Sequence, residues 1–168
     1  MYFARMNIYI LRHGIALERE DWNGDDSKRP LTRDGEKQLE KISKAMKKLD
    51  LEFDLILSSP FERAKKTAEI VAEQLDLKKI LKFSGDLTPE GDPESLVAEI
   101  NKLKPENPVL VGHEPYLSNF ISQLISDGEM EMDFKKAGLC KLKAERLKYG
   151  RCAKLCWLLT PKQTELMA

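Results

Sequence analysis

The chain has 168 residues, of which 42% are hydrophobic, so one domain can bury a core without disulfides or metals. Lys plus Arg and Asp plus Glu number 28 each, and this balance gives no reason to expect a nucleic-acid partner. No apolar run is long enough to span a membrane, and the first residues lack the pattern of a signal peptide. We therefore expect a cytoplasmic protein with no membrane partner and one domain over residues 1–168, in which residues 1–5 are a candidate N-terminal extension.

Short apolar runs alternate with helix-period segments along the chain. This order predicts strands joined by helical crossovers, and hence an α/β fold in which helices flank a mainly parallel central sheet as a three-layer sandwich. The predicted strands are residues 7–11, 55–57, 80–83 and 108–111. Their nearly continuous apolar character is typical of strands that are buried on both faces.

Four segments carry apolar residues at helical spacing and predict amphipathic helices. The apolar positions are Leu39, Ile42, Met46 and Leu49, then Ala64, Ala68, Val71 and Leu75, then Leu96, Ile100 and Leu103, then Leu117, Phe120, Ile121 and Leu124. Thr32 is the expected N-cap of the first helix, and Asp92 followed by Pro93 is the expected start of the third.

The end of the chain and one loop follow other patterns. Residues 139–146 and 152–159 alternate with period two around Tyr149-Gly150-Arg151, which predicts a hairpin added to the sheet. Residues 18–30 have neither period, and we expect them to form a surface loop that leaves directly from the end of the first strand.

The three cysteines, Cys140, Cys152 and Cys156, are odd in number. Cys152 and Cys156 would lie about 13 Å apart along a strand, which is a poor geometry for zinc. We expect reduced cysteines that pack as small hydrophobic residues.

The chain contains only two histidines, and each follows a predicted buried strand. His13 follows the first strand and His113 follows the strand at 108–111, so both should lie at the edge of the sheet where ligands gather in α/β proteins. A single histidine is usually a hydrogen-bonded structural residue, but two at equivalent positions indicate a site. Gly14 and Gly112 flank them, and we expect their N–H groups to be free to point at an anion.

Two arginines are expected at the same edge. Arg12 precedes His13, and Arg63 comes one helical turn after the strand at 55–57. Each could be an ordinary surface arginine, but together they can hold a phosphate dianion. A neutral imidazole can then act as the nucleophile in phosphoryl transfer, while the guanidiniums and the second imidazole supply positive charge. This donor set needs no metal, and two histidines without a carboxylate cluster are a thin ligand set for zinc.

Four segments in order resemble motifs of the histidine phosphatase superfamily, which includes the phosphoglycerate mutase-like enzymes. They are residues 11–14 (LRHG), 29–35 (RPLTRDG), 58–64 (SSPFERA) and 111–115 (VGHEP), and within the superfamily the resemblance is closest to phosphohistidine phosphatases of the SixA type. The resemblance implies a phosphoglycerate mutase-like fold and no cofactor. It implies that His13 is the phosphorylated nucleophile, that Arg12 and Arg63 hold the phosphate, and that His113 completes the pocket.

The sequence favours one function and leaves alternatives open. The chain has no long insertion between the second helix and the strand before His113, and an open pocket would admit a side chain of another protein. We expect a phosphohistidine phosphatase acting on a protein such as a phosphotransfer domain. The alternatives are a phosphatase of small phosphomonoesters with the same nucleophile, and a phosphate-binding module without turnover. Glu90 is the best candidate for a general acid, and Glu18 is its rival.

Overall fold

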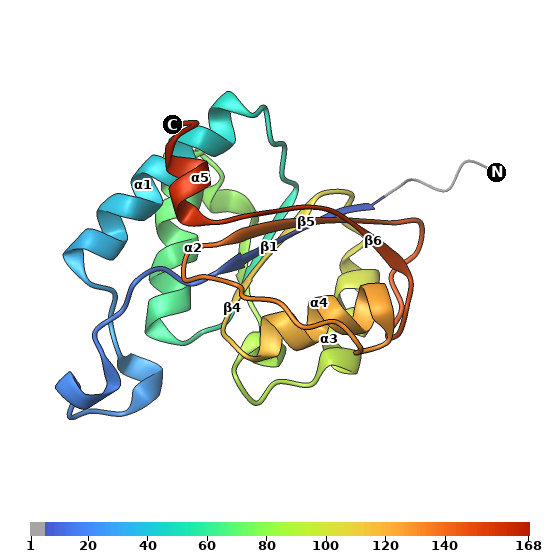
Figure 1. Cartoon of the computed structure of the whole chain (residues 1–168), viewed down its shortest axis with the longest axis horizontal. Helices are drawn as coiled ribbons and strands as arrows, with labels where there is room; N and C mark the ends of the chain where they lie inside the picture. Colours follow the sequence, from blue (N-terminus) through green and yellow to red (C-terminus); the bar gives the residue numbers. More distant parts are fainter. Residues whose placement is uncertain (1–5) are drawn as a thin grey trace.

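The computed structural model describes residues 6–168 (Figure 1), so the candidate extension at residues 1–5 lies outside the described residues. The strands are β1 (Met6–Arg12), β2 (Leu55–Ser58), β3 (Leu81–Phe83), β4 (Pro108–Gly112), β5 (Leu139–Ala144) and β6 (Ala153–Leu159). The helices are α1 (Arg33–Lys48), α2 (Glu62–Gln74), α3 (Pro93–Leu103), α4 (Tyr116–Ser126) and α5 (Pro161–Glu165).

The six strands form one sheet in the order β3-β2-β4-β1-β5-β6. Strands β1 to β4 are parallel neighbours, whereas β5 and β6 form an antiparallel hairpin that joins the sheet beside β1. The predicted strands, the mainly parallel sheet and the added hairpin are therefore confirmed, with strand ends shifted by one or two residues.

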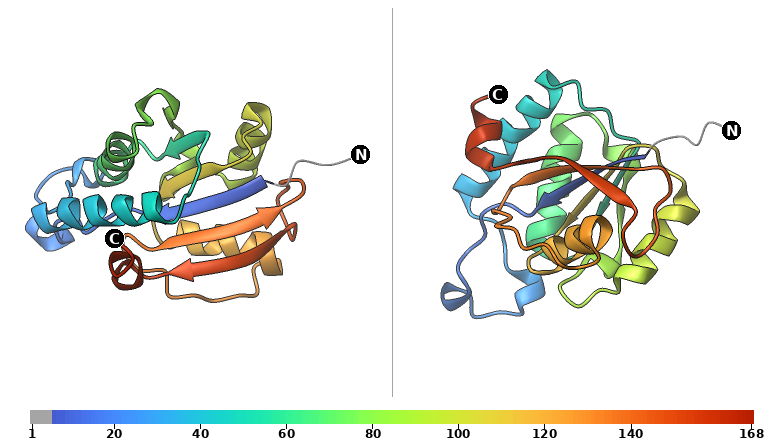
Figure 2. Two further views of the ribbon diagram at one scale, coloured as in Figure 1. Left: turned by 90° about the horizontal axis from the view of Figure 1, so that it is seen from above. Right: turned by 45° about the vertical axis from the view of Figure 1, so that its right-hand side comes forward.

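Helices cover both faces of the sheet (Figure 2), which gives the predicted three layers. The alternation of side chains along β1 separates the two cores, since successive residues of a strand point to opposite faces. Ile8 and Ile10 pack with residues of α3 and α4, and Tyr9 and Leu11 pack with residues of α1 and α2.

The helix starts follow the predicted capping chemistry. Thr32 Oγ1 accepts a hydrogen bond from Gly35 N at 3.0 Å, and Asp92 Oδ2 accepts one from Ser95 N at 2.9 Å. Helix α5 was not predicted because five residues are too few to show a period. Its start is fixed by a capping box at Thr160, and it lies beside α1 in Figure 1.

The expected surface loop has a defined course. Trp22 Nε1 donates to Asp25 O at 2.9 Å, and an antiparallel bridge between Ala16 and Leu31 closes the base of the loop. Two 3-10 turns, Arg19–Asp21 and Asp26–Lys28, lie within it. These contacts fix the conformation of the loop, which lies at the carboxyl end of β1.

Two further expectations concern cysteines and membranes. All three cysteines are free; Cys140 is buried as expected, but Cys156 is exposed because it lies on the edge strand β6. Within residues 6–168, the structure has no helix that combines the length and the apolar character needed to cross a membrane.

Candidate active site

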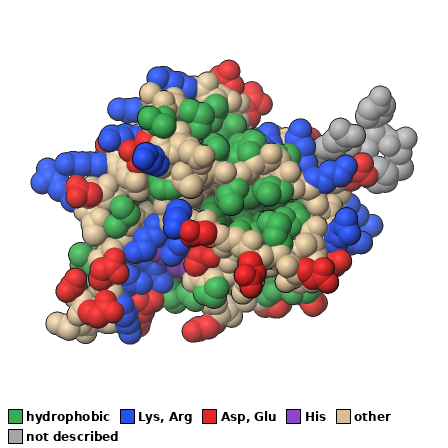
Figure 3. Space-filling model, viewed as in Figure 1, with side chains coloured by type: hydrophobic (Ala, Val, Ile, Leu, Met, Phe, Trp, Pro, Cys, Tyr) green, Lys and Arg blue, Asp and Glu red, His purple; other side chains and the backbone are tan. Residues whose placement is uncertain are grey.

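Three neighbouring parallel strands bring the site together. Strands β1, β4 and β2 lie side by side, so their carboxyl ends meet at one edge of the sheet. His13 follows β1 and His113 follows β4, and their ring centroids are 5.2 Å apart with an interplanar angle of 55°. Little histidine surface shows between the acidic and basic side chains in Figure 3, in line with exposed fractions of 5% for His13 and 1% for His113.

The surroundings of His13 define which ring nitrogen can react. Its Nδ1 lies 2.8 Å from the carbonyl oxygen of Gly14, which can only accept, so Nδ1 carries the proton. Its Nε2 accepts a hydrogen bond from Arg63 Nε at 3.3 Å, which is consistent with a lone pair on Nε2. Burial, with smaller contributions from His113, Arg63 and Arg12, lowers the pKa of His13 well below its usual value. The imidazole is therefore neutral at pH 7, and Nε2 is its nucleophilic atom.

The structure differs from the sequence expectation at Gly14. The Gly14 N–H donates to Thr67 Oγ1 at 3.1 Å, so it is not free to bind an anion. Gly14 instead acts through its carbonyl, which fixes the tautomer of His13. The absence of a side chain also suits the packing, because a Cβ at Gly14 would lie 2.9 Å from Leu39 Cδ1.

Both arginines lie where the sequence predicts. Arg12 Nη1 donates to Phe134 O at 2.7 Å, while Arg12 Nε is buried without a hydrogen-bond partner among residues 6–168. Burial lowers the pKa of Arg12, and the charges of Glu114 and Asp133 oppose the shift. Arg63 lies in the first turn of α2, and its side chain is 5% exposed. A tetrahedral anion beside His13 would give the buried Arg12 Nε–H a partner.

His113 has a different environment from the one expected. Its Nε2 lies 2.8 Å from Ser59 Oγ, and its Nδ1 is buried without a partner in the described part of the chain. Burial, followed by the positive charge of Arg63, lowers the pKa of His113 to about 3. The expectation that this second imidazole supplies positive charge is therefore wrong for the free protein. A neutral His113 can still donate a hydrogen bond from Nδ1.

Comparison with known proteins settles the family. The model of the histidine phosphatase superfamily (branch 1) matches residues 8–84. The phosphohistidine phosphatase SixA of Escherichia coli is 31% identical over 123 residues, which are 71% of this chain and 74% of that protein. The chain belongs to the histidine phosphatase superfamily.

Other proteins match along almost the whole chain. An uncharacterized protein of Picosynechococcus is 35% identical over 94% of this chain and 98% of its own length. The solved structure of the protein histidine phosphatase SixA complexed with tungstate has a TM-score of 0.81, with 26% identity over 94% of this chain and 98% of that chain. A phosphoglycerate mutase from Bacillus anthracis has the same fold, with a TM-score of 0.70 and 16% identity over 97% of this chain and 96% of that chain. The predicted phosphoglycerate mutase-like fold is thus confirmed.

The two general-acid candidates lie in exposed positions. Glu90 is exposed in the turn that Gly91 N closes by donating to Thr88 O at 3.0 Å. Glu18 is exposed and forms an ion pair with Lys136 at 3.3 Å. Neither side chain is buried, whereas a general acid at pH 7 is usually a buried carboxyl group.

Three residues at this histidine phosphatase site were not predicted as site residues. Ser59 contacts His113, Thr67 contacts Gly14, and Asp26 contacts Arg63. Ser59 could have been found, because it directly follows β2 at the same edge as the histidines. Thr67 lies four residues after Arg63 on α2, a spacing that also fits a core position. Asp26 lies in an irregular loop, where no periodicity indicates the direction of a side chain.

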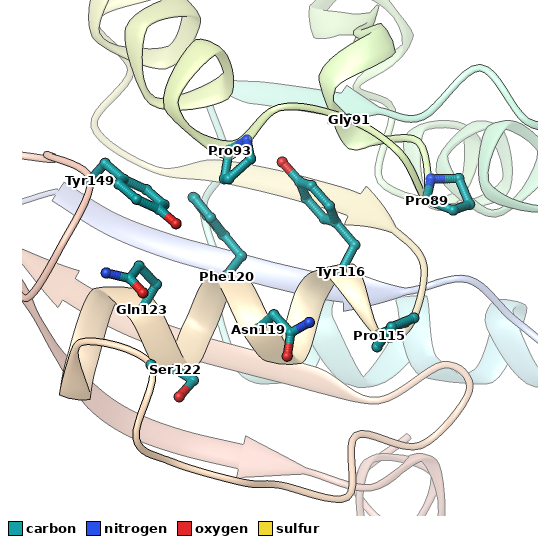
Figure 4. Close-up of a pocket in the computed structure, with 11 residues that line it drawn as sticks. Pro89, Gly91, Pro93, Pro115, Tyr116, Asn119, Phe120, Ser122, Gln123 and Tyr149 are labelled. Carbon is teal, nitrogen blue, oxygen red and sulfur yellow. The ribbon is translucent and has the colours of Figure 1, made fainter.

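A separate cavity lies next to the site along the chain. Its volume is about 380 Å³, and it begins at Pro115, two residues after His113. Figure 4 shows Tyr116 and Phe120 rising from α4 towards Pro89, in the loop before α3, and Pro93, the first residue of α3. The remaining lining residues are also uncharged.

Proposed function

We propose that the chain is a phosphohistidine phosphatase that works through a phosphoryl group on His13. The observation that carries the proposal is the tautomer of His13. Its Nδ1–H is held by Gly14 O, and its unprotonated Nε2 lies beside the cationic Arg63. A buried neutral nucleophile next to fixed positive charge is what phosphoryl transfer requires.

The reaction has two displacements at phosphorus. In the first, His13 Nε2 forms a bond to phosphorus while the bond between phosphorus and the leaving group breaks. In the second, water attacks the phosphorus of phospho-His13, inorganic phosphate is released, and Nε2 regains its lone pair. Arg12, Arg63 and the Nδ1–H of His113 are the groups proposed to stabilise the charge on the equatorial oxygens in both steps.

The protonation states near His13 favour phosphohistidine over an alkyl ester as substrate. An alkoxide needs a proton from a general acid, but His113 is neutral at pH 7 because its pKa is lowered to about 3. The two arginines hold their protons too strongly for this task. A phosphorylated imidazole needs no such donor when its second nitrogen is protonated, because it then leaves as neutral imidazole.

The relatives support the same substrate class. The curated relative from Escherichia coli is named a phosphohistidine phosphatase, and the tungstate complex is of a protein histidine phosphatase. The partner proposed here is accordingly a protein that carries phosphohistidine, such as a phosphotransfer domain. We also propose that the reaction needs no metal or cofactor.

A substrate panel tests the proposal. The values of kcat/KM are compared for a phosphohistidine protein, a phosphohistidine peptide and an alkyl phosphomonoester, with His13→Ala as the control. We expect the phosphohistidine substrates to rank first and His13→Ala to be inactive on all three. A higher kcat/KM for the alkyl ester would indicate a small-molecule phosphatase, and phosphate binding without turnover would indicate a binding module.

A further inference from the structure

Asp26 connects the loop after β1 to the site. It begins the second 3-10 turn of the loop, and its side chain is 34% exposed. Asp26 Oδ2 accepts a hydrogen bond from Arg63 Nη2 at 3.0 Å, and the main-chain oxygen of Asp26 accepts one from Arg63 Nη1 at 2.8 Å. One residue of the loop thus binds both terminal nitrogens of a buried arginine.

These contacts determine how Arg63 faces His13. A guanidinium group presents its donors along fixed edges of a plane. Asp26 occupies the edge formed by Nη1 and Nη2, and Arg63 Nε then points to His13 Nε2 at 3.3 Å. Phe61 limits the remaining freedom, since its ring centroid lies 5.5 Å from Arg63 Cζ. The edge of Arg63 that meets the reacting nitrogen is therefore the one that Asp26 leaves available.

A carboxylate close to a phosphate site needs compensation, because its charge would repel the dianion. Asp26 Oδ1 accepts hydrogen bonds from Arg29 Nε at 2.9 Å and from Arg19 Nη1 at 3.3 Å. Partial burial raises the pKa of Asp26, but the hydrogen bond from Arg29 and the charge of Arg63 outweigh burial and lower the pKa overall. Asp26 is thus ionised at pH 7, and the three guanidiniums around it keep the cluster positive.

We propose that Asp26 is a positioning residue for the phosphoryl site: it holds the Nη1–Nη2 edge of Arg63 so that Nε–H faces the space beside His13 Nε2, where a phosphoryl oxygen takes over this hydrogen bond when Nε2 attacks phosphorus. Arg29, the first residue of the segment RPLTRDG, acts behind it by holding Asp26 and by donating to Leu17 O. This inference rests on the proposed function of His13. It gives Arg29, which is not among the groups proposed to contact the phosphate, a role in holding the loop.

The test compares Asp26→Asn and Asp26→Ala with the matched control Asp25→Asn. Asp25 is the neighbouring loop carboxylate, and it caps the same turn by accepting from Ser27 N at 2.8 Å, a contact that asparagine can keep. Turnover of a phosphomonoester with a good leaving group gives kcat and KM. Titration with inorganic phosphate gives the affinity for the anion separately.

For both Asp26 variants we expect kcat to fall by about tenfold or more, since small errors of orientation have large effects on rate. Asp26→Ala should lose more than Asp26→Asn, which retains one acceptor oxygen. The affinity for inorganic phosphate should stay unchanged or rise, because a negative charge has been removed. Asp25→Asn should resemble the wild type in both measurements.

Three results would overturn the inference. A kcat of Asp26→Asn within about twofold of the wild type would show that Arg63 is held without Asp26. A rise in kcat/KM would show that Asp26 blocks the site instead of ordering it. A loss of phosphate affinity equal to the loss of kcat would indicate a damaged loop.

A measurement without turnover separates this inference from the proposed function. The ¹⁵N-attached proton of Arg63 Nε should give a protected NMR signal in the wild type and in Asp25→Asn, and should lose its protection in both Asp26 variants. If the wild type shows this signal but forms no phospho-His13, the proposed function fails while the positioning of Arg63 by Asp26 stands. Equal protection in all four proteins would overturn the positioning role whatever the activity.

Discussion

Ser59 Oγ lies 2.8 Å from His113 Nε2 and also accepts a hydrogen bond from Phe61 N at 3.2 Å. We assign the serine O–H as the donor to His113 Nε2, which places the ring proton of His113 on Nδ1. We predict that Ser59→Ala lowers kcat for a phosphohistidine substrate by about tenfold, since one orienting hydrogen bond is lost. Steady-state kinetics measures this change.

Ser58→Ala is the matched control for this prediction. Ser58 is equally buried at the same end of β2, but its Oγ donates to Ser59 O at 3.0 Å. Both variants should lose some stability, which urea denaturation would measure, and only Ser59→Ala should lose kcat. Equal losses of kcat in the two variants would contradict the role assigned to Ser59.

The two buried histidines predict how stability depends on pH. The pKa of His13 is lowered well below its usual value, and that of His113 is lowered to about 3, mainly by burial. Below about pH 6.5 the unfolded chain binds protons at both histidines while the folded protein does not. The free energy of unfolding should therefore fall as the pH falls below this value, with a slope approaching ~1.4 kcal/mol per pH unit for each histidine.

A single substitution isolates one of the two contributions. The chain has only two histidines, so His113→Gln should remove about half of this slope between pH 6.5 and 5. Urea denaturation of both proteins at several pH values measures the slopes. Identical slopes in the wild type and the variant would show that His113 is not held neutral by the fold.

The strands and most helices could be predicted because their apolar spacing reports directly on burial. The same pattern located both histidines, since each follows a nearly continuous apolar strand, and the carboxyl ends of such parallel strands lie at the ligand-binding edge. Hydrogen bonds between distant parts of the chain could not be predicted in this way. The N–H of Gly14, for example, donates to Thr67, which is 53 residues away in the chain. Asp26 was missed for a similar reason, because the direction of a loop side chain depends on its tertiary partner and not on a local period.

We predict that chelation leaves the rate unchanged. Arg12 and Arg63 provide the fixed positive charge at the site, and this charge does the work that a divalent ion does in metal-dependent phosphatases. Turnover is measured before and after treatment with EDTA and gel filtration, and again after addition of Mg²⁺, Mn²⁺ or Zn²⁺. Loss of activity on chelation followed by recovery with one of these ions would refute the prediction.

The substrate classes can also be separated through Glu90. This carboxylate lies in an exposed turn after β3, and Glu18, which is paired with Lys136, is the rival donor. We predict that Glu90→Gln and Glu18→Gln each keep kcat/KM for phosphohistidine within about twofold of the wild type, because a protonated phosphoimidazole leaves without a general acid. Hydrolysis of an alkyl phosphate should be slow in the wild type. If one of these two glutamates donates the proton to the alkoxide, its glutamine variant should lower this rate further, by about 10² or more, and the other variant should not. Parallel measurements of kcat/KM on both substrates, with Glu94→Gln on α3 as the control, distinguish these cases. A large and equal loss on both substrate classes would mean that the substituted glutamate organises the site, and it would remove the support that leaving-group chemistry gives to phosphohistidine as the substrate.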